Sequence, residues 1–408
     1  MIPGKMKAKA ISVLIIVLIF SSFPVIAEQE QPAGWKGKIG KENGIRSIKN
    51  PEEPLYGEIS FELEEDLSIG REDDENYMFY DLVSIAVDAE NNIFVLDRGN
   101  TRIQKYDRNG NYLQTIGRKG QGPGEFLDLR YMTMSNINLD AQGNLCVKEQ
   151  GRRLHIFDKN ANFKNVIHLS MNIGFPFGMT KDGNIQTQAM SGTREKMSAD
   201  IVLLNSEGRK IKTIASYPIH LPPRIRGRII LHNPYTPGLM LCLLNTGQGI
   251  YGYSQEYRLF VFDSSGEVEY FIEKNEPPRP IKKDEKNKLM DRYMESQRQR
   301  EQGLKLSRGE VKKGYIFPEH RPFFKGIIKD DKDRIYVLRF KSPLDKEKNE
   351  KYDLFSREGY YLYKVTMPSI PFPVIKDGYI YTSQRDKDTG ISRVIRYRIK
   401  NWDKIETQ

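Results

Sequence analysis

The chain is poor in the residues that most often build cross-linked or metal-containing sites. It has only two cysteines, Cys146 and Cys242, in 408 residues. Both lie in apolar, strand-like runs, so we expect them to be buried as small hydrophobic side chains in preference to forming a disulfide. The five histidines are His155, His168, His220, His232 and His320. They do not show metal-ligand spacing, and the sequence therefore predicts no metal site.

A long apolar run is also missing. The stretch ISVLIIVLIF at 11–20 has about half of the ~20 residues that a membrane-spanning helix needs. It follows Lys5, Lys7 and Lys9 and precedes Ala27, which is the basic, apolar, small-residue order of a secretory signal peptide. We expect cleavage after Ala27 and a periplasmic or secreted protein without an integral membrane anchor. An uncleaved anchor is the weaker alternative.

Negative charge is in deficit. The formal net charge is +10, and removal of residues 1–27 takes away three lysines and no acid, which leaves +7. A basic protein favours anionic partners, although this balance does not indicate a fold. Since export argues against nucleic acid, the expected partners are a protein, an anionic polysaccharide or a small polar ligand. We expect a monomer.

What the chain does contain is a repeat of short apolar runs joined by Asn-, Asp- and Gly-rich turns, a pattern typical of antiparallel strands. An acidic or Gly-containing turn precedes a second run at Ile93, Leu145, Ile185, Ile250, Ile335 and Ile380. A third run follows each of these at Arg102, Arg153, Asp200, Arg258, Lys351 and Arg393. A fourth run closes the first five units but is absent from the sixth. The pattern predicts six units of four strands with one strand missing.

The missing strand is predicted near the other end of the chain. The segment Phe61–Gly70 resembles a fourth run and belongs to no unit. If it completes the last unit, the ring closes and no blade is left with an unpaired edge. The sequence therefore predicts an all-β, six-bladed β-propeller of four-stranded blades over 61–408, closed by an N-terminal strand. Residues 28–60 are polar, with Pro51 and Pro54 and no periodicity, and are predicted to be a linker.

One stretch shows a family resemblance. NNIFVLDRGNTRIQKYDRNGNYLQTIGRKGQGPGEF, at 91–126, resembles the repeat of NHL-type six-bladed propellers, especially their exported bacterial members. The resemblance implies a binding or interaction scaffold. Some related propellers are lyases or lactonases with a divalent metal in the central channel, so a metal-dependent enzyme is the alternative. Three acids, Asp81, Glu125 and Asp128, lie near the expected channel entrance, but no ligand set can be matched and no catalytic residue or cofactor is assigned.

The spacing between units is uneven, and the surplus residues fall in connections that emerge on one face of a propeller. Insertions concentrated on one face of a rigid scaffold commonly form its binding surface. This face is rich in basic residues, which are the predicted ligand-binding residues. They are Arg118, Lys119, Arg130, Arg224, Arg226, Arg228, Arg321, Arg339 and Lys341. In PPRIRGR the three arginines alternate, which predicts that they lie on one side of an extended segment.

The largest insertion, 275–322 between units four and five, is predicted to be partly helical. Residues 282–303 lack Pro and interior Gly. Leu289, Met290, Tyr293 and Met294 form an apolar stripe at helical spacing. We expect this stripe to pack on the propeller's own face, with a lid or partner-docking helix as the alternative.

Overall fold

Antiparallel sheets make up most of the computed structural model. It describes residues 31–127, 129, 136–149, 152–219, 221–227, 231–298, 305–386 and 390–405. The predicted signal peptide and Asp128, Arg130, His220 and Arg228 lie outside the described residues. Residues Gly34–Gln408 form one unit, to which everything below refers. No helix in the described part of the chain is long and apolar enough to span a membrane.

Each of the first three blades is a four-stranded sheet whose strands follow in sequence order. Blade one contains β5 (Leu82–Val87), β6 (Ile93–Asp97), β7 (Arg102–Tyr106) and β8 (Tyr112–Ile116). Blade two contains β9 (Asn136–Leu139), β10 (Leu145–Glu149), β11 (Arg153–Phe157) and β12 (Phe163–His168). Blade three contains β13 (Ile173–Met179), β14 (Ile185–Thr193), β15 (Lys196–Leu204) and β16 (Lys210–Ile219). Residues 191–199 extend the β14–β15 hairpin beyond the length of the neighbouring blade strands.

The remaining blades incorporate strands from the N-terminal part of the chain. Blade four contains β17 (Leu239–Leu243), β18 (Gly249–Tyr253), β19 (Arg258–Phe262) and β20 (Val268–Lys274). Blade five contains β21 (Phe324–Lys329), β22 (Ile335–Arg339), β23 (Asn349–Phe355) and β24 (Tyr361–Pro368). Blade six contains β25 (Val374–Lys376), β26 (Tyr379–Arg385), β27 (Ser392–Ile399) and β4 (Leu63–Ile69). A short 3₁₀ turn, Trp402–Lys404, follows β27.

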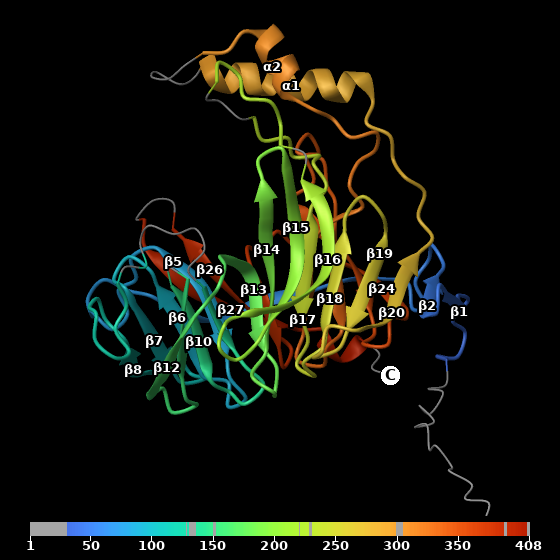
Figure 1. The fold of residues 1–408 in the computed structure, drawn as a ribbon. Coiled ribbons are helices and arrows are strands. Elements are labelled where there is room, and N and C mark those ends of the chain that lie inside the picture. Colours follow the sequence, from blue (N-terminus) through green and yellow to red (C-terminus); the bar gives the residue numbers. More distant parts are fainter. Residues whose placement is uncertain are drawn as a thin grey trace, which may run out of the picture. The chain divides into compact units, whose positions relative to one another are not determined.

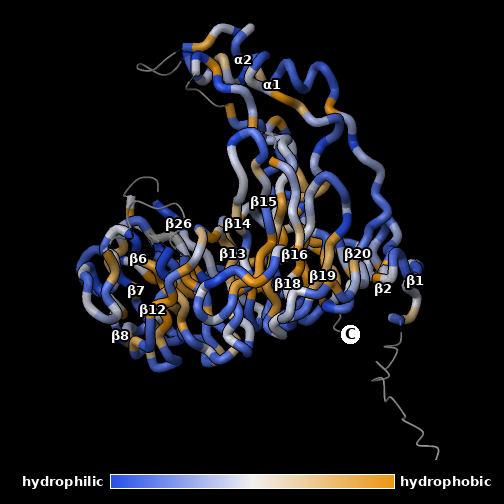
Figure 2. The backbone as a smooth tube through the Cα atoms, viewed as in Figure 1, coloured by the Kyte–Doolittle hydropathy of each residue, from blue (hydrophilic) through white to orange (hydrophobic). Residues whose placement is uncertain are grey.

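The predicted ring closure is confirmed. β4 pairs antiparallel with β27, with Ile69 opposite Val394 and Leu63 opposite Ile399. Each pair of neighbouring blades shares a buried apolar cluster, so the core is continuous around the ring (Figure 1). Representative residue pairs, one from each of the two blades, are Leu96 and Val147 for blades one and two, Leu154 and Phe177 for two and three, and Ile201 and Leu241 for three and four. They are Leu259 and Phe324 for blades four and five, Tyr336 and Ile380 for five and six, and Val394 and Val95 for six and one. Figure 2 shows hydrophobic residues concentrated in the strands and hydrophilic ones in the turns.

The predicted linker at 28–60 is wrong from Lys38 onward. β1 (Lys38–Glu42) and β2 (Ile45–Asn50) form a hairpin, and β2 pairs parallel with the outer strand of blade four. β3 (Glu58–Ser60) pairs parallel with the outer strand of blade five. The chain thus crosses the outer edges of blades four and five before it completes blade six. β1 and β2 can pair as a hairpin because Asn43 and Gly44 adopt the positive φ angles of a tight turn, 50° and 85°.

The repeated turns owe their shape to aspartate. The carboxylate of Asp107 accepts hydrogen bonds from the backbone N–H groups of Asn109 and Asn111, both at 2.8 Å. Asp88, Asp140 and Asp158 make the same contacts two and four residues ahead. Side-chain acceptors of this kind replace backbone partners in tight turns. Most turn acids are therefore structural. Both cysteines are free and buried, as predicted.

Candidate functional site

Two insertions of neighbouring connections pack together beyond the ends of the blade strands. We call residues 221–235 and 281–317 the cap. It includes α1 (Lys283–Arg298), which confirms the predicted helix within the described residues, and α2 (Arg308–Gly314), which was not predicted. Figure 1 shows both helices clear of the six blades, beyond one face. This is the face on which fourth strands lead into the next blade.

The cap has a hydrophobic core of its own. Ile225, Leu231, Met290, Leu306 and Val311 are buried together, with Tyr293, Met294 and Tyr315 packed against them. The apolar stripe of α1 therefore packs mainly on the other insertion and on α2, which corrects the expectation that it lies on the propeller face. The cap touches the blades through Leu289, which shares a buried cluster with Phe340 at the end of β22.

An arginine–carboxylate pair ties the two insertions together. Arg226 donates two hydrogen bonds to Glu310, from Nε at 2.6 Å and from Nη2 at 2.9 Å. Glu310 and Ser307 also form a capping box at the start of α2. The hydrogen bonds from Arg226 and Ser307 lower the pKa of Glu310 to about 2. The Ser-x-x-Glu spacing of Ser307 and Glu310 is a sequence signal for the start of a helix, although α2 was not predicted from it.

The predicted alternation of Arg224, Arg226 and Arg228 is wrong over the described part of that segment. Ile225 is buried, and Arg226 has a φ of 50°, followed by Gly227 at 71°. A residue in the left-handed region turns the chain, so an extended strand with all arginines on one side does not form. Arg224 is exposed, and Arg226 is engaged with Glu310.

Glu310→Gln should loosen the start of α2. The folded-state pKa of Glu310 is below the ordinary value, so its contribution is present above pH ~4.5 and lost as the pH falls toward ~2. We expect hydrogen-exchange protection factors over 307–314 to fall across that window in the parent protein. In Glu310→Gln they should be low already at neutral pH. Glu295→Gln, which removes an exposed partner of Arg298, is the control; equal protection in all three proteins would contradict this role.

Most of the predicted binding residues pair with acids of the chain. The shortest ion-pair distances are 2.7 Å for Arg118–Glu125, 2.6 Å for Arg226–Glu310, 2.8 Å for Arg321–Glu285, 2.7 Å for Arg339–Glu276 and 3.3 Å for Lys341–Glu350. Lys119 lies in a bridge opposite Phe126. The structure brings Arg321 and Arg339 into one region and leaves Arg118 on the loop between blades one and two. Compensated charges of this kind do not by themselves attract an anion.

A buried charged cluster lies between blades four and five beneath the cap. Asp353 is fully buried and accepts hydrogen bonds from Tyr257 and Tyr361, both at 2.5 Å. Its carboxylate also meets Lys274 at 3.0 Å and Arg339 at 3.4 Å. Burial, with the neighbouring Asp353, raises the pKa of both tyrosines well above its ordinary value. We call Lys274, Glu276, Arg339 and Asp353 the junction cluster; two cations balance two anions.

Hydrogen bonds also join the cap to the blades. Tyr235 donates to Glu285 of α1 at 2.5 Å and lies 2.6 Å from the Ser342 hydroxyl. Arg321 donates to the other oxygen of Glu285 at 2.8 Å. Burial and the Glu285 contact raise the pKa of Tyr235 to about 12. Because Tyr235, Glu285 and Ser342 are all buried, these bonds hold the cap in a defined position.

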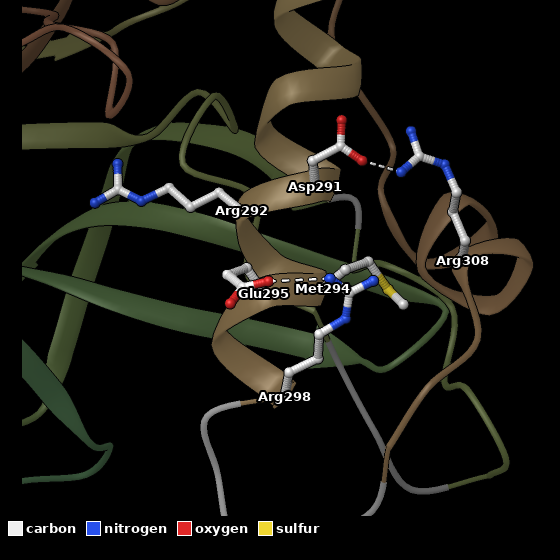
Figure 3. A pocket seen from close by; sticks show the side chains of 6 residues that line it. All are labelled: Asp291, Arg292, Met294, Glu295, Arg298 and Arg308. Carbon is white, nitrogen blue, oxygen red and sulfur yellow. Dashed lines mark hydrogen bonds and ion pairs between the residues drawn. The ribbon is translucent and has the colours of Figure 1, made fainter.

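The cap also contains a hollow of about 560 Å³ between α1 and α2. Figure 3 shows the charged side chains that line it. Arg308 pairs with Asp291, and Arg298 pairs with Glu295 at 3.1 Å. Arg292 donates to the carbonyl of Pro343 at 2.6 Å. Of these contacts, the Arg308–Asp291 pair joins the two helices, and the Arg292 contact ties α1 to the segment after β22.

Four exposed apolar side chains lie on the face from which fourth strands lead into the next blade. Tyr80, Leu127 and Phe372 lie in the connections that lead into blades one, two and six, and Phe175 lies in β13, the first strand of blade three. Their exposed fractions are 70%, 43%, 78% and 49% in that order. We call them the mouth residues. These four blades are neighbours in the ring, so the residues follow one arc of the entrance. Large exposed hydrophobic groups gathered in this way commonly mark an interaction site.

The carboxylates next to this arc have structural partners. Asp97 accepts from the backbone N–H of Tyr80 at 2.9 Å and from Arg102 at 3.0 Å, and Glu149 accepts in the same way from Leu127. Asp81 pairs with Arg98. Among the described residues, no group of three or more His, Cys, Asp or Glu is placed to hold a metal ion. His155, which is fully buried, contacts Glu149 at 2.8 Å.

Comparison with curated proteins gives no match. Several solved structures are similar. A Bacteroides fragilis protein inferred to be exported shares 12% identity, with 86% of this chain and 100% of that chain covered and a TM-score of 0.47. The calcium-binding protein regucalcin of Agrobacterium tumefaciens shares 9%, covering 84% and 96%, with a TM-score of 0.38. Virginiamycin B lyase of Staphylococcus aureus shares 11%, covering 83% and 89%, with a TM-score of 0.36.

The family comparison concerns the first three blades. Residues 74–222 match the model of a family described as "6-bladed beta-propeller". Together with the six sheets, this match confirms the predicted six-bladed β-propeller fold. The chain is a six-bladed β-propeller that is similar, over residues 74–222, to the family of that description.

Proposed function

We propose that the protein is an exported binding propeller that recognises an acidic protein partner through its insertion face. The observation that carries this proposal is the location of the positive charge. The cap segments contain fourteen Lys and Arg against six Asp and Glu, a formal +8. Residues 28–408 carry +7, so the remainder of this region is close to neutral. The basic character of the mature protein is thus a property of the cap.

Much of this charge is available to a partner. Lys305 is exposed just before α2, and Lys312 and Lys313 are exposed in its last turn. Lysine is a strongly hydrated point charge without the planar fork of arginine, so it suits an extended anionic surface better than a single bound anion. Charge on one surface steers association and accelerates encounter with an oppositely charged partner.

The mouth residues favour a protein over a polysaccharide. They are placed on the same face as the cap because they lie in, or directly after, connections from a fourth strand to the next blade. Ile316, within the cap, is also 54% exposed. A surface with exposed aromatic and aliphatic groups beside a charged rim has the anatomy of a protein interface. An acidic polysaccharide would use the lysines and leave the apolar arc uncovered.

The test compares two triple variants by quantitative cross-linking in cell-envelope extract. Lys305→Gln/Lys312→Gln/Lys313→Gln removes three exposed cap charges. We expect recovery of an acidic partner to fall about tenfold, which corresponds to about 1.4 kcal/mol. The affinity lost in the variant should equal the affinity that the parent protein loses when the salt concentration is raised.

The intact mass of the purified protein tests export. It should correspond to a chain that begins at Glu28, as cleavage after Ala27 requires.

The matched control removes the same charge from the opposite face. Lys159, Lys181 and Lys332 are exposed in turns there, and changing all three to Gln should leave recovery unchanged. Equal losses in both variants would reduce the effect to net charge and contradict a cap-specific interface. Unchanged partner recovery with the cap variant would also contradict the proposal. Binding to heparin but to no acidic protein would point to a polyanion instead.

A further inference from the structure

Two arginines face each other at the base of the cap. Pro280 and His320 form an antiparallel bridge, and the N–H of Arg321 donates to the carbonyl of Arg279 at 2.9 Å. Arg279 and Arg321 are therefore directly opposite each other on neighbouring segments. Opposite residues in an antiparallel pair extend on the same side, about 5 Å apart at Cβ, and like charges in this position are destabilising.

Compensation is incomplete for one of these two arginines. Arg321 has Glu285 at 2.8 Å. Among the described residues, the acid within ion-pair distance of Arg279 is Glu276, at 3.9 Å, and that carboxylate is already held by Arg339 at 2.7 Å and by Lys274 at 3.0 Å. Burial lowers the pKa of Arg279, and the nearby Arg339 and Arg321 lower it further, whereas Glu276 and, more weakly, Asp345 oppose the shift. Since the junction cluster is balanced by itself, Arg279 adds an excess positive charge.

Two guanidinium N–H groups also lack a protein acceptor. Within the described part of the chain, Arg279 Nη2 and Arg321 Nε are buried atoms without a hydrogen-bond partner. Buried polar groups are almost always satisfied, and an exception points to a bound water or ion. The side chains as a whole are 40% and 25% exposed, so part of each arginine side chain is open to solvent beside its buried N–H group.

We propose that Arg279 and Arg321 form a binding site for an oxyanion, the phosphate or carboxylate group of a small ligand. Guanidinium groups bind such anions through charge-assisted hydrogen bonds with directional geometry. The anion would supply the missing acceptors and relieve the repulsion between the opposed arginines. This site goes beyond the proposed protein interface, since it uses neither the cap lysines nor the mouth residues, and it stands or falls separately.

Inorganic phosphate is the probe. Phosphate should raise the Tm of the parent protein in a saturable way at constant ionic strength, because a ligand that binds only the folded state stabilises it. Sodium chloride at the same ionic strength should not reproduce the shift. In Arg279→Gln the apparent Kd for phosphate, measured by calorimetry, should rise at least tenfold. Citrate in a parallel titration distinguishes phosphate from carboxylate preference.

Three variants make the outcome decisive. Arg279→Lys keeps the positive charge but removes the planar guanidinium group with its paired N–H donors, and it should bind phosphate more weakly than the parent. Arg298→Gln, an exposed cap arginine paired with Glu295, should bind like the parent. The Lys305/Lys312/Lys313 triple variant should retain the phosphate shift even where partner recovery is lost. An unchanged phosphate affinity in a folded Arg279→Gln or Arg279→Lys protein would overturn the site, as would an equal loss in Arg298→Gln.

Discussion

Asp353→Ala should lower the free energy of unfolding by about 3–5 kcal/mol, because it removes one partner from a buried ion cluster. Lys274, whose side chain is only 1% exposed, would keep a single acid, Glu276 at 3.0 Å. Tyr257 and Tyr361 would each lose the acceptor of a 2.5 Å hydrogen bond. Urea unfolding of the parent and variant proteins measures the difference.

Graded substitutions separate the cluster from a simple loss of volume. Tyr361→Phe removes one donor but leaves Asp353 its other partners, so about 1 kcal/mol is expected. Asp182→Ala, at an exposed turn, should stay within about 0.5 kcal/mol of the parent. If Asp353→Ala is no more destabilising than Tyr361→Phe, the cluster does not stabilise the interface between blades four and five.

Asn50→Ala should be nearly as damaging, with a loss of about 3 kcal/mol. Its carbonyl oxygen accepts from Trp35 Nε1 at 2.9 Å and from the backbone N–H of Tyr361 at 2.8 Å, and its amide donates to the carbonyl of Gly359 at 2.9 Å. Asn50 is 3% exposed, so alanine would strand three polar groups away from water. Each such group costs about 1–3 kcal/mol.

Two further variants test this assignment by thermal and urea unfolding. Asn50→Asp keeps the acceptor oxygens but loses the donor to Gly359, so it should be intermediate or, if charge burial dominates, as unstable as Asn50→Ala. Asn109→Ala, at an exposed turn position, should be close to neutral. A neutral Asn50→Ala would show that the N-terminal hairpin is a dispensable attachment.

The blade strands could be predicted because each one repeats a local signal. An apolar run after an Asp- or Gly-containing turn is sufficient to locate a strand, and six copies reinforce one another. Closure was predictable for a related reason: Phe61–Gly70 resembled a fourth run, and the sixth unit lacked one. The register of β4 against β27 confirms that argument.

The N-terminal hairpin was missed although its signal was present. Asn43-Gly44 is the strongest short-range hairpin dipeptide, and it joins KIGKE to IRSIKN. The prolines and high polarity of 28–60 obscured it. Its position could not have been predicted, because Asn50 is fixed by contacts with Gly359 and Tyr361, more than three hundred residues away in sequence.

The candidate site was less predictable than the fold. Basic residues on the insertion face could be counted from the sequence, but their acidic partners could not. Arg339 meets Glu276 and Asp353, which lie in other segments of the chain, and Arg226 meets Glu310 across two insertions. Arg279 was overlooked because its significance depends on the arginines that lie beside it and on the acid, Glu276, that it shares with Arg339. Such information exists only in the tertiary structure.

The pairing of β4 with β27 also orders events in time. Arg396 binds Asp66 across 330 residues of sequence, and closing a loop of that length costs roughly 5 kcal/mol of chain entropy. A strand made near the beginning of synthesis must therefore wait for one made near the end, while its backbone groups remain unpaired. Strand pairs of such large sequence separation form slowly. The ring is completed in a late step, and until then both strand edges are exposed to other chains.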